Sequence, residues 1–222
     1  MTKNTIKDVP KNAIKRSTRI ITEVLNAGTH GIGGIIAIIG MVLLILKGIA
    51  TQSISSIIAY VIYGSSLIIM FMNSTLYHSF KFTKVAKIFR RLDHTSIYLL
   101  IAGTYTPYLI ISMTQPWGYI FLAVIWLIAI VGIVLKIGWI DRFPKLSMCL
   151  YLCMGWLSLI LIYPLYKNIP LPGLILLAVG GLAYSVGTLF YRLKHNPWMH
   201  IIWHLFVMIG AGFMYTSIYL YV

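Results

Sequence analysis

The chain of 222 residues is 59% apolar and only 10% charged, and its mean hydropathy is +0.89. Because soluble domains carry about 25% charged residues, this composition excludes an ordinary soluble globular protein. The net charge of +14 does not indicate nucleic-acid binding, since the basic residues lie between apolar segments and form no groove-binding pattern. We therefore expect an all-α integral membrane protein.

Apolar segments long enough to cross a hydrocarbon core of roughly 30 Å recur along the chain. Seven of them are found, at 28–46, 55–78, 92–113, 117–136, 146–165, 171–190 and 197–220. The breaks after the third and the fifth are short, so the helices on either side of them should be antiparallel. We predict a basic segment over 1–27 and a single domain of seven transmembrane helices over 28–222.

The basic residues are distributed unevenly between the predicted spans. Alternate segments hold 16 of the 18 Lys and Arg residues, and the remaining segments hold two. By the positive-inside rule, the N-terminus is cytoplasmic and the C-terminus external. The same charges predict contact with anionic lipids of the inner leaflet. We expect no cleavable signal peptide, and we expect a multi-pass protein of a bacterial plasma membrane.

A histidine pair begins the last predicted span. His200 and His204 are four residues apart, which places both imidazoles on one face of a helix. The predicted topology brings His78, at the end of the second span, into the same leaflet. Imidazole is the commonest protein ligand of zinc, and three imidazoles leave a tetrahedral ion with one open position, as in catalytic sites. The sequence thus predicts zinc as a cofactor, held by His78, His200 and His204.

Two further residues are predicted to act beside this metal. A water in the open position would be acidified and could serve as a nucleophile. Asp93 enters the third span at a similar depth and could accept a proton from that water or orient a ligand, while Ser74 lies one turn before His78 and could reach the water or a substrate carbonyl. The alternatives are an interfacial His78 and an Asp93 that caps its helix or pairs with Arg90.

Two groups of small residues have structural interpretations. Cys149 and Cys153 lie four apart in the fifth span, and we interpret them as packing residues rather than a disulfide or metal pair. The glycines of the first span are predicted to allow close helix approach. They are Gly28, Gly31, Gly33 and Gly34.

Four stretches, in this order, make the chain similar to the haemolysin III family, within the larger progestin and adipoQ receptor group. They are 23–31, 74–78, 92–107 and 200–207. The resemblance covers all seven predicted spans. It implies a seven-helix fold with a cytoplasmic-side zinc bound by the equivalents of His78, His200 and His204, with Ser74 and Asp93 near the bound water. It also implies a relationship to membrane-embedded alkaline ceramidases, which hydrolyse lipid amides.

The chain departs from the family pattern at Tyr215, where a further histidine is frequent. That position lies about three turns beyond the last ligand, so the metal should be unaffected. Glu23 matches the first family motif with its role open, and one interpretation is an interfacial partner for Arg19. The remaining histidines are interpreted as hydrogen-bonded or interfacial residues. They are His30, His94 and His195.

Three classes of function follow. The first is a zinc-dependent hydrolase of a membrane lipid amide or ester, so the chain is a candidate enzyme. The second is a non-enzymatic sensor or receptor of membrane homeostasis, in which the metal only joins the second and seventh spans. The third is the cytolytic activity that the family name suggests. It has the least physical support, because pore formers usually need amphipathic segments that can rearrange.

Overall fold

The computed structural model describes residues 11–139, 144–193 and 195–222, and every regular element in these ranges is helical. The all-α class is therefore confirmed. The elements are α1 (Lys11–Ala50), α2 (Ile54–Ser79), α3 (Ala86–Ile111), α4 (Trp117–Trp139), α5 (Pro144–Trp156), the 3-10 turn η1 (Leu157–Leu159), α6 (Ile162–Tyr166), α7 (Leu171–Arg192) and α8 (Trp198–Tyr221).

Five of the described helices are long and apolar enough to cross a membrane, namely α1, α2, α4, α7 and α8. The chain is thus a multi-pass membrane protein. The helix α3 has 26 residues but is more polar, because its buried face carries Thr95, Ser96 and Thr106. Such side chains are tolerated where they bond within the protein, and the hydroxyl of Thr106 donates to the carbonyl of Ala102.

The fifth predicted span is not one continuous helix, because α5 gives way to η1 and then to α6. At this break the hydroxyl of Tyr105 donates to the carbonyls of Met154 and Gly155, at 3.0 and 2.8 Å. Those two carbonyls would accept the amides of residues 158 and 159 in a continuous helix. Pro164, which has no N–H to donate, lies in the short α6. The hydroxyl of Tyr105 on α3 therefore supplies a hydrogen-bond donor to carbonyls that have no helical partner at the interruption.

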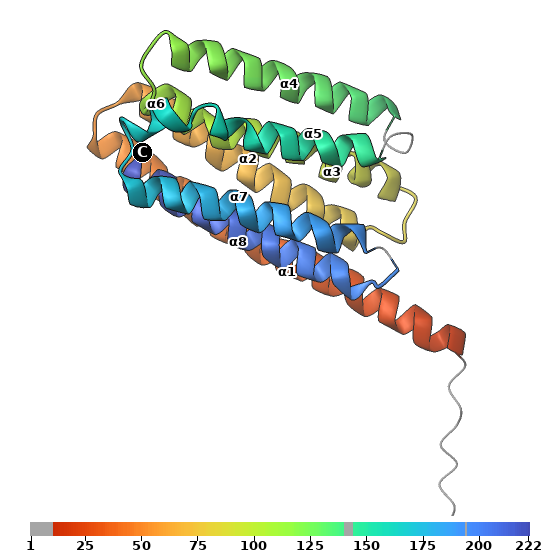
Figure 1. Ribbon diagram of the computed structural model, residues 1–222. Coiled ribbons are helices and arrows are strands. Elements are labelled where there is room, and N and C mark those ends of the chain that lie inside the picture. The colour runs from red at the N-terminus through yellow and green to blue at the C-terminus, as the bar shows by residue number, and fades with distance from the viewer. Residues whose placement is uncertain (1–10, 140–143, 194) are drawn as a thin grey trace, which may run out of the picture.

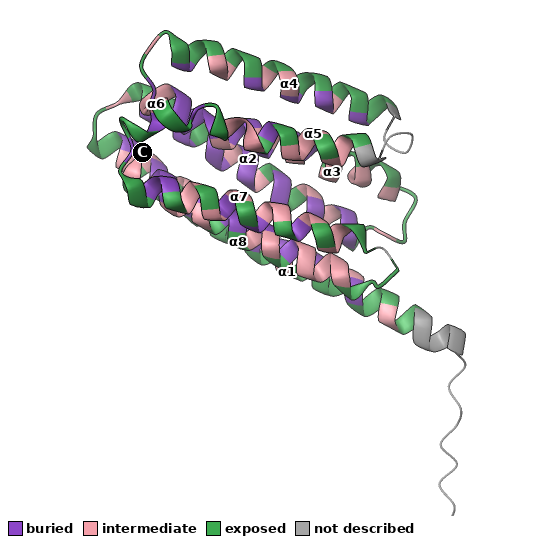
Figure 2. Cartoon of the chain, in the orientation of Figure 1, coloured by how far each residue is buried: buried purple, intermediate pink, exposed green. Residues whose placement is uncertain are grey.

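The helices surround a central space. Helix α1 packs against α2 and α8, α2 against α3, and α7 against α8, while α5 touches α3, α4 and α7. Helix α4 packs on α3 at the outer edge of the bundle, and α1 extends past the other helices at its N-terminal end (Figure 1). Exposed residues cover the outward faces of the helices, as Figure 2 shows, and many of them are large and apolar. That distribution suits a lipid environment.

The packing roles predicted for the glycines of the first span and for the two cysteines are only partly confirmed. A Cβ atom at Gly33 would lie 2.7 Å from the ring of Phe71, and one at Gly34 would lie 3.2 Å from the sulfur of Met72, so close approach of α1 and α2 is confirmed there. At Gly28 a Cβ would meet nothing within 4 Å, so the prediction is wrong for that residue. The packing role of the cysteines is wrong too. Cys149 and Cys153 are both exposed on α5.

Candidate metal centre

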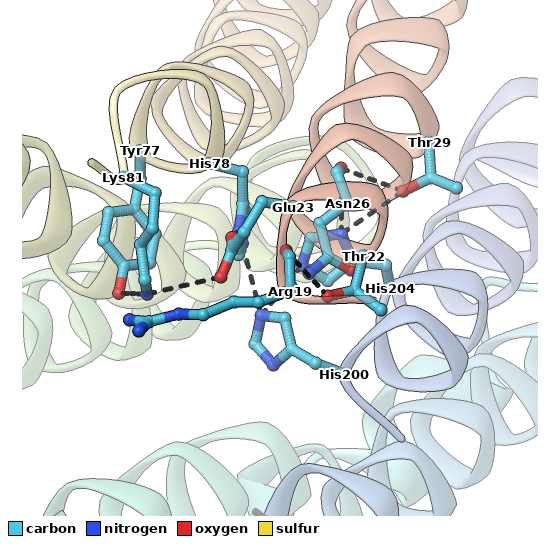
Figure 3. Close-up of polar contacts among 10 residues, drawn as sticks. All are labelled: Arg19, Thr22, Glu23, Asn26, Thr29, Tyr77, His78, Lys81, His200 and His204. Atoms are coloured by element: carbon cyan, nitrogen blue, oxygen red, sulfur yellow. Dashed lines mark hydrogen bonds and ion pairs between the residues drawn. The ribbon is translucent and has the colours of Figure 1, made fainter. Parts of the chain in front are cut away.

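Three histidines converge where α2 ends and α8 begins, an end of the bundle called here the triad end (Figure 3). The Nε2 atom of His200 lies 3.2 Å from Nε2 of His78 and 3.2 Å from Nε2 of His204. The ligand atoms of these three residues, the histidine triad, all lie within 4.8 Å of one another. Zn–N bonds of about 2.0 to 2.1 Å in a tetrahedron separate neighbouring nitrogens by about 3.4 Å. The triad could therefore hold a metal ion.

Local structure brings the pair on α8 to this position. The side-chain oxygen of Asn196 accepts a hydrogen bond from the amide of Trp198 at 3.1 Å, and α8 begins at Trp198. Asn196 thus bonds to the start of α8, and Pro197 is the residue directly before the first helical position. The spacing of four then aligns His200 and His204 on one face.

The other ring nitrogens of two triad members face acceptors. Nδ1 of His78 lies 2.5 Å from the carboxylate of Glu23, and Nδ1 of His204 lies 3.2 Å from the backbone carbonyl of Asn26. An acceptor at Nδ1 keeps the proton there and leaves Nε2 with its lone pair. Lone pairs of both residues are thus directed at Nε2 of His200. A cation between the three nitrogens would be bound by these lone pairs. Metal-bound histidines usually donate from their other ring nitrogen to a carboxylate or a carbonyl, as His78 and His204 do here.

Burial strengthens these interactions. His204 is 1% exposed and His78 is 3% exposed, while His200 is half-buried. The ammonium of Lys81 lies 3.9 Å from Glu23 and donates to the hydroxyl of Tyr77. Charges away from water interact more strongly than exposed ones, so Glu23 is held in a fixed position beside the triad.

The two residues predicted to act beside the metal lie together. Ser74 of α2 is buried, and its hydroxyl lies near enough to interact with the carboxyl group of Asp93 on α3. Both line the same cavity as the triad. Asp93 does not cap its helix, because α3 begins at Ala86. The interpretation of Asp93 as an N-cap is therefore wrong.

The other histidines stay outside the triad. The ring of His30 is buried and stacks on His204, with 3.6 Å between ring centroids and 12° between planes. His30 is outside the ligand group, in line with the prediction that it is not a ligand, but neither of its ring nitrogens has a hydrogen-bond partner among the described residues. The carbonyl of His94 accepts the hydroxyl of Tyr151, and His195 is exposed.

Sequence reasoning missed the residues that orient the triad. The ion pairs of Glu23 within 4 Å among the described residues are with His78 and Lys81, while its predicted partner Arg19 acts on it electrostatically from a longer distance. Asn26 contributes a backbone carbonyl, a role that no side-chain pattern signals. A signal did exist for Glu23, because polar residues at 23, 26 and 30 recur at helical spacing on one face of an otherwise apolar helix.

A cavity of about 850 Å³ extends from the triad towards the opposite end of the bundle. Its walls come mainly from α1, α2, α3, α5, α7 and α8, and its far part is lined by Tyr108, Leu165 and Met214. Small-molecule sites typically measure roughly 300 to 1,000 Å³. The triad therefore lies in the wall of a space large enough for an organic ligand.

The sequence pattern of the family described as Haemolysin-III related matches residues 18–215. The chain belongs to this family. It is 44% identical over 208 residues to Hemolysin-3 of Bacillus cereus, covering 93% of this chain and 95% of that protein. It is 42% identical over 199 residues to the Hemolysin-3 homolog of Bacillus subtilis (strain 168), covering 90% and 93%. It is also 30% identical over 202 residues to the human monocyte to macrophage differentiation factor, covering 88% and 82%.

Membership of the haemolysin-III-related family confirms the resemblance seen in the sequence, and the matched range includes all three triad residues. The departure at Tyr215 has a structural role. Its hydroxyl donates to the carbonyl of Gly40 at 3.0 Å and so joins α8 to α1. Tyr215 lies eleven residues after His204 and does not belong to the triad.

Proposed function

We propose that this protein is a zinc-dependent hydrolase of a membrane lipid amide or ester. One observation carries the proposal: three convergent imidazoles share the wall of a long cavity with the interacting pair Ser74 and Asp93. A metal-ligating cluster, a carboxyl group and a largely apolar cavity together match the usual composition of a catalytic pocket.

The metal would be held by His78, His200 and His204. A zinc ion there would supply Lewis acidity, polarising a substrate carbonyl and making a water a better nucleophile at neutral pH. Glu23 and the Asn26 carbonyl keep two of the ligands in the tautomer and orientation that ligation needs. These are the contributions of the chain to binding.

Proton movement is assigned to Asp93. Its carboxylate can take a proton from a water in the cavity and return it to the amine or alcohol that leaves. The hydroxyl of Ser74, which interacts with that carboxyl group, would help to orient it. The far part of the cavity would take the hydrocarbon chain of the lipid and exclude water from the reaction.

The membrane orientation is part of the proposal. We infer seven spans, with α3 and the broken segment α5 to α6 completing the five long apolar helices, in a plasma membrane. Of the 18 Lys and Arg residues, 16 lie in the alternate segments that include the triad end, and two lie in the segments on the other side. This asymmetry supports a cytoplasmic location of the triad end. The exposed Lys84, between α2 and α3, and the exposed Lys87, in the first turn of α3, would contact anionic lipids there.

A second function is favoured by one feature of the fold. The triad links α2 to α8, whereas α2 otherwise packs on α1 and α3, and α8 packs mainly on α7 and less on α1. A metal bound there could serve only to join two helices of a non-enzymatic membrane sensor or receptor. The double variant of His200 and His204 to Ala separates the two functions, since a folded but inactive protein favours the enzyme and an unfolded protein favours the structural metal.

The direct test uses purified, zinc-loaded protein with short-chain ceramides and related amide and ester lipids. Wild type should release fatty acid from at least one of them. Asp93→Asn should keep most of its zinc and lose about 10² to 10⁴ in rate, the usual contribution of general acid and base groups. Ser74→Ala should cost less, because it removes a single hydrogen bond. The hydrolase proposal fails if no lipid is cleaved, or if Asp93→Asn is as fast as wild type.

A further inference from the structure

Lys136 is a buried cation in the wall of the cavity. It lies on α4, is 5% exposed, and donates from Nζ to the hydroxyl of Ser147 on α5 at 3.1 Å. It also interacts electrostatically with Asp93. Lys84, by contrast, is exposed. Membrane topology accounts for exposed basic residues, but it does not explain why an ionisable group at the end of a span is buried within the protein, and such a group indicates a functional site.

The charges around the cavity do not balance. Its described lining contains four Lys and Arg residues against the two acids Glu23 and Asp93. The four are Arg19, Lys81, Arg90 and Lys136. Glu23 is already engaged by His78 and Lys81. With neutral histidines, the lining therefore carries two more positive than negative charges, and a cavity with low-dielectric walls concentrates their field on an anion.

These charges meet an apolar surface within the same cavity. Arg19 of α1 is exposed and also lines the cavity, with its guanidinium 5.4 Å from the ring centre of Phe82. Further in, the wall is formed by residues such as Leu161, Leu165 and Met214. An amphiphile with an anionic head and a hydrocarbon tail is complementary to both parts.

We propose that the cavity binds a lipid whose head carries a phosphate or carboxylate group, held by Lys136 and attracted by the positive charge of the lining, to which Arg19 contributes, with its hydrocarbon chain in the apolar part. The assignment of this lipid as the substrate rests on the proposed function, since the anionic group would then lie beside the bond that is cleaved. The site differs from the surface contact of Lys84 with the inner leaflet, because Lys136 is not accessible to a membrane surface.

Binding can be measured without turnover. The protein in phosphatidylcholine nanodiscs, with its metal removed by a chelator, is titrated with hexadecyl phosphate, hexadecylphosphocholine and inorganic phosphate. The fluorescence of Trp156 and Trp203, which line the cavity, reports binding. Hexadecyl phosphate should bind more tightly than the other two probes. Lys136→Met should weaken it about tenfold or more, the loss expected for one charge-assisted hydrogen bond.

Matched variants decide the interpretation. Lys136→Arg should restore most of the affinity, Arg19→Gln should weaken it without a change in folding, and Lys84→Gln, an exposed cation at the same end, should leave it unchanged. The inference is overturned if the zwitterionic probe or inorganic phosphate binds as tightly as hexadecyl phosphate, or if neither Lys136→Met nor Arg19→Gln weakens binding. None of the probes has an amide or carboxylic ester bond. A failure to hydrolyse lipids would therefore count against the proposed function and leave this result standing.

Discussion

The carboxylate of Glu23 lies 2.5 Å from Nδ1 of His78, joining the first helix to the candidate metal centre on the second. Glu23 is thus connected to the triad through one ligand only. The contact fixes the tautomer of His78 and makes its free nitrogen a stronger ligand, as carboxylate partners of metal-bound histidines commonly do.

Replacing Glu23 by Gln should therefore weaken zinc binding. The amide oxygen can still accept from Nδ1, but the charge is lost, and changes of this kind typically cost about 10-fold to 100-fold in metal affinity. Competition with a chromophoric chelator would measure the dissociation constant. Lys84→Gln removes a nearby exposed charge and should bind zinc like wild type. Equal affinities for Glu23→Gln and wild type would contradict the assignment.

Loss of a ligand should have a larger effect than loss of its partner. His204→Ala should reduce the zinc content of purified protein from about one ion per chain to a small fraction, because two imidazoles hold the ion far less tightly than three. His195→Ala is the matched control, since His195 is exposed and outside the triad. Elemental analysis of both variants gives the answer. Full zinc retention in His204→Ala would rule out the triad as the metal site.

The contact between α2 and α3 should be sensitive to the addition of a side chain at Gly103. A Cβ atom there would lie 2.1 Å from the hydroxyl oxygen and 2.6 Å from the Cβ of Ser66, so the two helices must move apart. Gly103→Ala should lower the free energy of unfolding by about 1 to 3 kcal/mol, the usual cost of overpacking. Thermal unfolding in detergent measures the effect.

The control for this substitution is Gly212→Ala. A Cβ at Gly212 would meet nothing within 4 Å, and Ala is the better residue inside a helix by about 0.5 to 1 kcal/mol. Its melting temperature should equal or exceed that of wild type. If Gly103→Ala melts no lower than Gly212→Ala, the close packing of α2 on α3 is not as described.

The proposed orientation predicts opposite locations for two positions. Cysteine at Lys84 should react with a thiol reagent only from the cytoplasmic side, and cysteine at Val222 only from outside, because the basic segments stay in the cytoplasm. The background would replace Cys149 and Cys153 by Ser, since both are exposed on α5. Labelling of both positions from the same side would refute seven spans.

The sequence by itself determined the helical class, the approximate positions of the apolar segments and the alignment of His200 with His204. These features depend on local properties, namely hydropathy over about 20 residues and the 3.6-residue period of a helix. The position of His78 at the same end also followed, because alternate spans return to the same side of a membrane.

Only the tertiary structure decided how each helix is rotated about its axis and which residues its faces therefore meet. That rotation brings Glu23 to His78, stacks His30 on His204 and turns Lys136 from a charge at the end of a span into a buried cation of the cavity wall. It also lets the hydroxyl of Tyr105 satisfy the carbonyls where the fifth segment is interrupted. Such contacts join residues far apart in the chain and result from the packing of whole helix faces, which no local period or spacing specifies.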